Sequence, residues 1–99
     1  MSYQIKLNAL ADEELLNSFV WYEIRSEGLG EKFILSVKNK LLQISEHPFR
    51  YPVKQDEFRE TGIKGFPFTI IYFVDDIKKV VLIFSIYHSK RNPNKKFGK

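Results

Sequence analysis

Polar and apolar side chains alternate at the start of the chain and then change to a helical period. The alternation covers residues 3–7 and predicts a short strand. Asn8 follows and is suited to begin a helix, because its side-chain oxygen accepts a hydrogen bond from a backbone N–H of the first turn. The next apolar residues recur at helical spacing and predict one stripe that faces a core: Ala11, Leu15, Phe19 and Tyr22, widened by Leu16, Val20 and Ile24.

A second helix is predicted after a short corner. Gly28 is expected to end the first helix, because glycine accepts the left-handed backbone conformation found there. The second stripe is apolar at helical spacing and consists of Phe33, Ile34, Val37, Leu41 and Ile44. His47-Pro48 ends it, since the residue before a proline avoids the helical conformation. Two consecutive helices with a tight corner predict an antiparallel hairpin.

The remainder of the chain reads as strands. Residues 48–56 contain two prolines and are interpreted as an irregular connection. Strands are predicted over residues 57–63, 68–74 and 79–87, and the last two are apolar on both faces, as in central strands. The fold class is therefore α+β, in the order β-α-α-β-β-β, with an antiparallel sheet packed against a two-helix hairpin. Two helices cover only one face of that sheet, so a partner protein or self-association is expected to cover the other.

Length and composition limit the classes of function. The chain has 99 residues, which predicts one domain over residues 1–99. It has no cysteine and no apolar run long enough for a membrane span or a secretion signal, so we expect a cytoplasmic protein without membrane contact. There is no phosphate-binding glycine loop, and the two histidines lack an evident third ligand. We therefore expect no cofactor and no metal site.

The positive charge is concentrated at the end of the chain. Five cationic residues and no acid lie in a short basic tail at residues 90–99, whereas the whole chain has a net charge of +4. Such a localised patch attracts polyanions or an acidic protein partner. The alternative is a solvated, frayed terminus.

A set of cations, one histidine and one tyrosine could carry chemistry on neighbouring strands. Arginine and lysine grip phosphate, and a histidine or tyrosine moves a proton, as metal-free RNA cleavage by 2′-hydroxyl attack requires. Structural alternatives remain: a salt bridge for Arg59, core packing for Tyr72 and a backbone hydrogen bond for His88. The set expected in one basic patch is Arg59, Lys64, Tyr72, His88, Lys90 and Arg91.

Several short motifs occur in a fixed order along the chain: Trp21-Tyr22-Glu23, residues 28–33, residues 44–48, Arg59, residues 66–74 and His88-Ser89-Lys90-Arg91-Asn92-Pro93. Together they resemble the RelE/ParE superfamily of toxins from type II toxin–antitoxin systems, and its ParE-like, plasmid-stabilisation branch most. The resemblance covers nearly the whole chain and implies a small sheet on a helical hairpin. It also implies a toxin that inhibits growth and is neutralised by a cognate antitoxin.

The resemblance implies two possible activities. ParE-like members inhibit DNA gyrase, whereas RelE-like members cleave mRNA on the ribosome with clustered basic residues and a C-terminal Tyr or His. The arginine that RelE-like members carry just before the third-strand tyrosine is missing before Tyr72, and no tyrosine follows Arg91. These departures favour the gyrase mode.

We therefore expect a ParE-like toxin that is not an enzyme and that binds gyrase and an antitoxin. The alternatives are a ribosome-dependent mRNA endonuclease, with His88, Arg91 and Arg59 as catalytic residues, and a diverged, non-toxic binding module. The residues expected to bind the target or another polyanion are Arg59, Lys64, Lys90, Arg91, Lys95 and Lys96. The oligomeric state is left open, as a homo- or hetero-oligomer.

Overall fold

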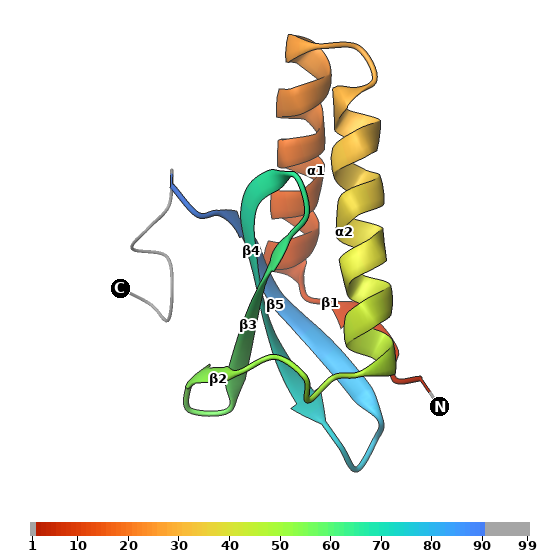
Figure 1. The fold of residues 1–99 in the computed structure, drawn as a ribbon, viewed down its shortest axis with the longest axis vertical. Coiled ribbons are helices and arrows are strands. Elements are labelled where there is room, and N and C mark those ends of the chain that lie inside the picture. The colour runs from red at the N-terminus through yellow and green to blue at the C-terminus, as the bar shows by residue number, and fades with distance from the viewer. Residues whose placement is uncertain (1, 91–99) are drawn as a thin grey trace.

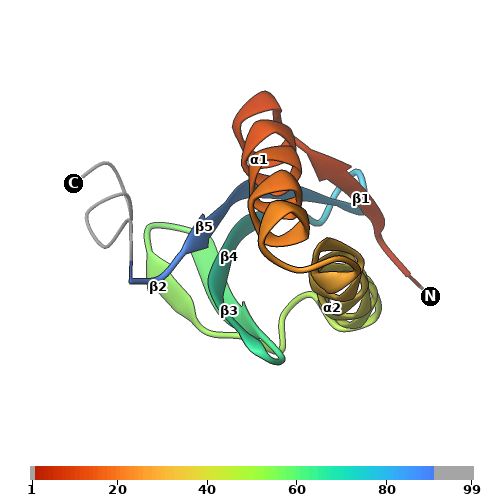
Figure 2. The same ribbon diagram turned by 90° about the horizontal axis from the view of Figure 1, so that it is seen from above.

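The computed structural model describes residues 2–90, in which a helical hairpin packs on one face of a twisted sheet (Figures 1 and 2). Arg91, Lys95 and Lys96 lie outside the described residues. The elements are β1 (Gln4–Leu7), α1 (Ala9–Arg25), α2 (Leu29–Glu46), β2 (Val53–Gln55), β3 (Phe58–Ile63), β4 (Phe66–Asp75) and β5 (Val80–His88). This arrangement confirms the predicted α+β class.

The sheet has five strands in the order β1-β5-β4-β3-β2 and is mixed. The β3–β4 and β4–β5 pairs are antiparallel, as predicted, and β2 also pairs antiparallel with β3. In contrast, β1 pairs parallel with β5, placing Ile5 beside Val81. The antiparallel expectation was therefore wrong for the first strand. A parallel pair requires a long connection between its strands, and the two helices and three strands between β1 and β5 provide one.

The strand β2 lies in the segment that was interpreted as irregular, and that interpretation was wrong for Val53–Gln55. All three of its residues are exposed, so they show no buried and exposed alternation. The strand exists because its backbone pairs with β3 at the edge of the sheet. Backbone pairing of this kind leaves no signal in the hydrophobic pattern.

The helix ends follow the predicted local chemistry. The Asn8 side chain accepts a hydrogen bond from the Ala11 N–H at 2.9 Å, and His47 ends α2. Gly28 is left-handed, with φ of 86°, but it begins α2, whereas Ser26 ends α1.

The corner between the helices is fixed by one carboxylate. Glu23 accepts hydrogen bonds from the N–H groups of Gly28 at 2.8 Å and Gly30 at 2.9 Å. A Cβ atom on Gly30 would lie 2.7 Å from the Phe19 carbonyl oxygen, which is closer than any real Cβ contact. Only glycine therefore allows the two helices to approach this closely.

The core lies between the helices and the sheet, and its members are Ala11, Tyr22, Phe33, Val37, Ile44, Phe68, Ile70, Tyr72, Val81, Ile83 and Ile86. Three apolar residues of α1 predicted to widen its buried stripe are instead exposed, by 62% at Leu16, 42% at Val20 and 77% at Ile24. They lie on the side of α1 that faces neither α2 nor the sheet. No helix of the described chain is both long enough and apolar enough to cross a membrane.

The sheet face opposite the helices carries aromatic rings that pack on one another. The Phe58 ring centroid lies 5.2 Å from that of Phe84 and 6.2 Å from that of Phe73. Leu82 and Phe84 are each 37% exposed. The aromatic rings on this face therefore shield part of one another from solvent, which the sequence pattern did not predict.

Candidate functional site

Arg59 on β3 is bound to the backbone of the loop that follows α2. Its Nη1 donates hydrogen bonds to the carbonyl oxygens of Tyr51 at 2.6 Å and Phe49 at 3.3 Å, and the guanidinium lies 5.1 Å from the Phe49 ring centroid. Cation–aromatic contact of this kind adds to the hydrogen bonds. Arg59 therefore has a structural role. It binds the loop backbone, whereas the structural alternative considered from the sequence was a salt bridge to an acid.

Tyr72 lies opposite Arg59 in the sheet and holds the same loop. Its side chain is fully buried, and its hydroxyl donates a hydrogen bond to the Pro48 carbonyl oxygen at 2.8 Å. Burial raises the pKa of Tyr72 to about 12, although the nearby charge of Arg59 works against that rise. At neutral pH the phenol remains protonated, so it serves as a core residue and hydrogen-bond donor.

His88 is the last residue of β5 and lies opposite Phe68 on β4. Its ring centroid is 5.2 Å from that of Phe68, and its Nδ1 accepts a hydrogen bond from the Lys90 N–H at 3.1 Å. The Ser89 N–H donates to the Pro67 carbonyl oxygen at 2.8 Å and ties the strand end to β4. The structural alternative considered for His88, a hydrogen bond to the backbone, is therefore present.

The structure does not bring the predicted residues into one patch. Arg59 lies opposite Tyr72 and His88 opposite Phe68. Those two positions are four residues apart in sequence, which corresponds to ~13 Å along β4. Arg59 and His88 also flank β4 on opposite sides, because β3 and β5 are different neighbours of it.

Lys64, in the turn before β4, and Lys90 lie at the His88 end of the sheet. The described cations of the predicted set are therefore divided between the two ends of the sheet. The roles predicted for Arg91, Lys95 and Lys96 concern positions outside the described residues.

A polar cluster around Tyr51 was missed by the sequence analysis. The Lys40 Nζ donates a hydrogen bond to the Tyr51 hydroxyl at 3.2 Å, and that hydroxyl donates to the Gln43 Oε1 at 3.1 Å. Burial works to raise the pKa of Tyr51, but the hydrogen bonds and charges of Lys40 and Arg50 outweigh it and lower the pKa. The spacing of Lys40 and Gln43, three residues apart on one helix face, was the only available signal.

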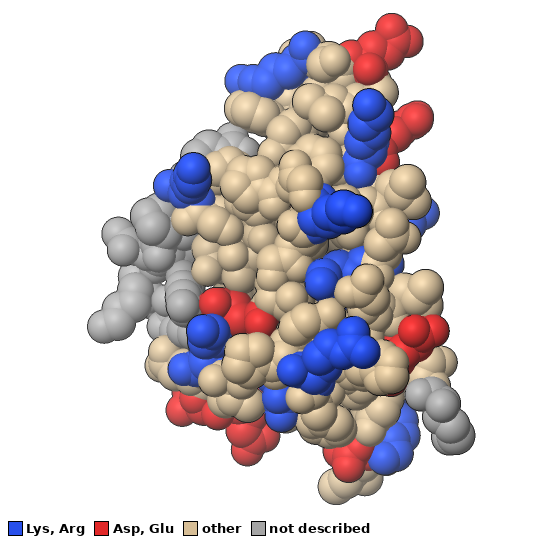
Figure 3. Space-filling view, in the orientation of Figure 1, with Lys and Arg blue, Asp and Glu red and all other residues tan. Residues whose placement is uncertain are grey.

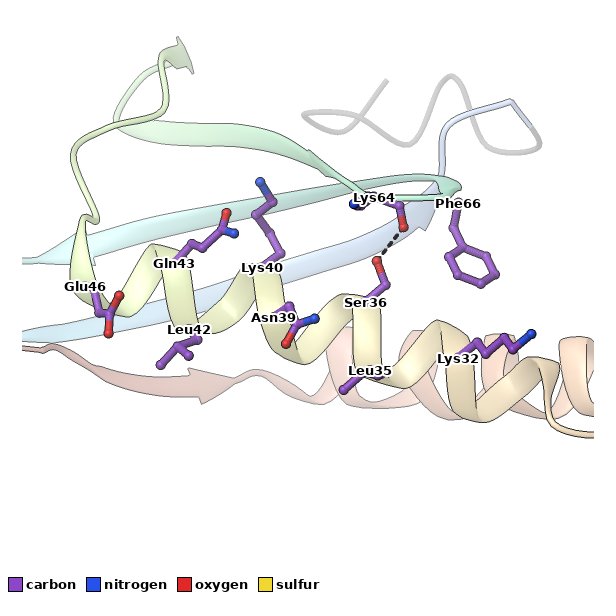
Figure 4. Close-up of a pocket in the computed structure, with 10 residues that line it drawn as sticks. All are labelled: Lys32, Leu35, Ser36, Asn39, Lys40, Leu42, Gln43, Glu46, Lys64 and Phe66. Carbon is purple, nitrogen blue, oxygen red and sulfur yellow. Dashed lines mark hydrogen bonds between the residues drawn. The ribbon is translucent and has the colours of Figure 1, made fainter.

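Two hollows lie on different sides of the protein. One is a groove of about 670 Å³ along α2 and the β3–β4 turn, shown in Figure 4; we call it the α2 groove. The other, of about 600 Å³, lies on the uncovered sheet face; we call it the sheet-face hollow. The α2 groove is lined by Lys32, Leu35, Ser36, Asn39, Lys40, Leu42, Gln43, Glu46, Lys64 and Phe66, and the sheet-face hollow by Asn8, Asp56, Glu57, Phe58, Phe73, Leu82 and Phe84.

Metal-binding side chains are not clustered in the described part of the chain. Among residues 2–90 there is no group of three or more His, Asp or Glu side chains placed to hold a metal ion.

Similar structures show that the fold occurs in toxin–antitoxin systems. The chain resembles one from the chromosomal ParDE system of P. aeruginosa, with a TM-score of 0.73 and 15% identity over 88% of this chain and 96% of that one. It also resembles a chain of the intact E. coli RelBE toxin–antitoxin complex, with a TM-score of 0.70 and 20% identity over 91% of this chain and 100% of that one.

A third similar chain comes from the RelBE2 toxin–antitoxin complex of Mycobacterium tuberculosis, with a TM-score of 0.65 and 16% identity over 89% of this chain and 92% of that one. A comparison with curated proteins finds no match. The sequence model described as "ParE toxin of type II toxin-antitoxin system, parDE" matches residues 5–93, which is nearly the whole chain. The protein therefore belongs to the ParE toxin family of type II toxin–antitoxin systems, within the predicted RelE/ParE superfamily.

Proposed function

We propose that this ParE-family protein stops growth by inhibiting DNA gyrase in the cytoplasm and is neutralised by a cognate antitoxin. The family supplies the toxin class, and the similar chains come from toxin–antitoxin complexes, which supports an antitoxin partner. The choice of gyrase over the ribosome comes from the chemistry that the described residues offer.

The observation that carries this choice is the separation of Arg59 from His88. Metal-free RNA cleavage needs a base, an acid and a cation around one phosphate, and each contributes about 10²-fold or more. Here the Arg59 Nη1 donates to two loop carbonyls, and the Tyr72 phenol, whose pKa is raised, donates to a third. His88 is then the one predicted proton carrier that remains. This incomplete set favours a function without RNA cleavage.

Cleavage of mRNA on the ribosome is the second candidate, and one feature favours it. His88 lies beside Lys90, and Lys64 is at the same end of the sheet, so a proton carrier and two cations occur together there. That end would be the active site if the protein were an endonuclease.

Two assays on the same purified protein separate these functions. We expect inhibition of plasmid supercoiling by gyrase, and no codon-positioned cuts when translated mRNA is mapped by primer extension. His88→Ala and Arg91→Ala serve as matched variants in both assays. Cuts that vanish in these variants, with supercoiling unaffected, would show that the protein is an mRNA endonuclease. Inactivity in both assays, with no growth inhibition, would indicate a diverged binding module.

A further inference from the structure

The sheet face opposite the helices is bordered by opposite charges at its two edges. Both helices lie on one side of the sheet, and β1 and β2 form its edges (Figure 2). On β1, Ile5 and Leu7 pack against the core, so the exposed residue between them, Lys6, points to the uncovered face. At the other edge, the turn between β2 and β3 carries the exposed acids Asp56 and Glu57, and Figure 3 shows Asp and Glu side chains around this turn, at the lower left. A cation therefore borders the face at β1, and two acids border it at the opposite edge.

Apolar side chains join these two edges in one row across the sheet. Lys6 lies opposite Leu82, and Leu82 lies opposite Phe73. The next strand contributes Phe58, whose ring centroid is 6.2 Å from that of Phe73. These apolar residues line the sheet-face hollow together with Phe84. From β1 to the β2–β3 turn, the row therefore runs from a cation through aliphatic and aromatic side chains to acids.

This row is complementary to itself. A two-fold axis parallel to the strands and passing over β4, the central strand, places β1 of one copy over β2 of the other. Lys6 of each copy then meets the acidic β2–β3 turn of the other, and Leu82 lies over Phe58. Phe73 lies near the axis and packs on its own equivalent. Opposite charges therefore meet at both ends of such an interface, and apolar side chains meet between them.

We infer that a second copy of the protein covers the sheet-face hollow, in a two-fold dimer that packs sheet on sheet. This inference goes beyond the proposed function and does not depend on it. Stacked sheets lie about 10 Å apart, a spacing that leucine and phenylalanine side chains from two inner faces fill. The helices of both copies lie on the outside of this dimer, because they cover the opposite face of each sheet. The α2 groove therefore stays open to other partners.

The area of the shared face limits the strength of the dimer. Strands spaced about 4.8 Å apart give a five-stranded face ~19 Å wide, and about six residues of strand give a length of ~20 Å. Such a face hides roughly 400 Å² of each copy, which is half of the ~800 Å² per partner in a standard stable interface. We therefore expect a reversible dimer with a dissociation constant on the order of 10–100 μM.

Other occupants fit the sheet-face hollow less well. Nucleic acid and acidic protein segments are repelled by Asp56 and Glu57 at its margin. A purely basic protein segment would satisfy these acids but would oppose Lys6 at the other edge. A second copy supplies an acid for the cation and a cation for the acids.

Sedimentation equilibrium of the full chain, at concentrations below and above the expected dissociation constant, measures the dimer and its response to charge reversal. One variant carries Lys6→Glu, and the other carries Glu57→Lys with Asp56→Asn. Asparagine is chosen at position 56 because φ there is 54°, a left-handed conformation that asparagine adopts more readily than lysine. We expect each variant alone to dimerise about tenfold or more weakly than wild type, because like charges then meet at both ends of the interface.

An equimolar mixture of the two charge variants is the decisive arm. In the mixed dimer the reversed charges face each other at one end and the native charges face each other at the other end. We therefore expect the mixture to dimerise within about threefold of wild type. Lys38→Glu and Glu13→Lys, at exposed positions on the helices, are the matched controls and should each dimerise like wild type.

A second pair of variants tests the apolar row. We expect Leu82→Ser with Phe84→Ser to weaken the dimer about tenfold or more. Leu16→Ser with Ile24→Ser removes exposed apolar side chains from α1 and should change the dissociation constant less than threefold. Thermal unfolding of every variant verifies that each one is folded.

Recovery of the dimer in the mixture, after its loss in each charge variant alone, supports the two-fold arrangement. A wild-type protein that stays monomeric at every concentration overturns the inference. Charge variants that dimerise like wild type overturn it, and so does a mixture as weak as its components. A dimer that the α1 variant dissociates and the sheet-face variants leave intact also overturns it, because such a dimer uses another face.

Discussion

The two ends of the sheet hold residues of the same chemical types and use them differently. At one end, Arg59 and Tyr72 direct their polar groups inward, to three carbonyl oxygens of the loop at residues 48–51. At the other end, His88 packs on Phe68 and Lys64 and Lys90 are exposed. The backbone therefore takes up the polar groups of Arg59 and Tyr72, whereas the side chains of Lys64 and Lys90 remain exposed.

The comparison also explains why one predicted patch became two regions. Backbone carbonyls of an irregular loop need donors, because a buried acceptor without one costs about 1–3 kcal/mol. Arg59 and Tyr72 satisfy that need beside α2. Among residues 2–90, no backbone carbonyl accepts a hydrogen bond from the side chain of Lys64 or Lys90, and both side chains are exposed.

The largest expected effect on stability comes from Arg59→Met. This change removes both hydrogen bonds to the loop, and we expect it to lower the free energy of unfolding by about 2–3 kcal/mol. Urea denaturation of the purified protein measures it. Lys54→Met, on the exposed strand β2, is the matched control and should change stability by about 0.5 kcal/mol or less. Equal effects in both variants would show that Arg59 does not hold the loop.

The next effect comes from Tyr72→Phe. The Pro48 carbonyl loses its donor while the ring stays in place, and we expect a loss of about 1–2 kcal/mol in the same measurement. Tyr3→Phe is the control, since it removes an exposed hydroxyl that donates to Asp76. If Tyr3→Phe costs as much as Tyr72→Phe, burial of the Tyr72 hydrogen bond is not what makes it strong.

Alkaline pH should reduce the contribution of Tyr72. Its pKa is about 12 in the folded protein against an ordinary value of 10.0, so the unfolded chain loses this proton first. The stability that the raised pKa provides is complete below pH 10 and is lost as pH rises toward about 12. We therefore expect the stability difference between wild type and Tyr72→Phe to shrink over that range. A difference that grows instead would mean that the phenolate is favoured in the fold.

The smallest effect on stability is expected at the opposite end of the sheet. Replacing the five cations of residues 90–99 with glutamine should change the free energy of unfolding by about 0.5 kcal/mol or less, because charge changes in a solvated terminus cost little. The same change should weaken growth inhibition, measured at equal expression, if these cations bind the target. Undiminished inhibition would favour the solvated terminus.

Short-range chemistry was predictable from the sequence, and long-range pairing was not. Asn8 at the start of α1 and His47 at the end of α2 were found because capping and the proline effect act over a few residues. The parallel partner of β1 and the edge strand β2 depend on backbone pairing between distant segments. Leu16 shows the same limit, because an exposed leucine at helical spacing looks identical to a buried one.

The candidate site was predictable only in its residue types. The sequence identified Arg59, Tyr72 and His88, but the acceptors of Arg59 and Tyr72 are backbone carbonyls, which no side-chain pattern reveals. The α2 groove was missed for a related reason. Lys64 lies in the turn that follows β3, and its carbonyl oxygen accepts a hydrogen bond from Ser36 of α2. The two residues are distant in sequence and come together only when the chain folds.

The parallel pairing of β1 with β5 has a consequence for how the protein is made. Ile5 and Leu7 are synthesised before both helices, whereas their partners Val81 and Ile83 are synthesised after them. The helical hairpin can form early from local contacts, but the sheet cannot close until β5 has left the ribosome. The order of synthesis therefore allows the helices, and with them the α2 wall of the groove, to form before the sheet that completes the fold is assembled.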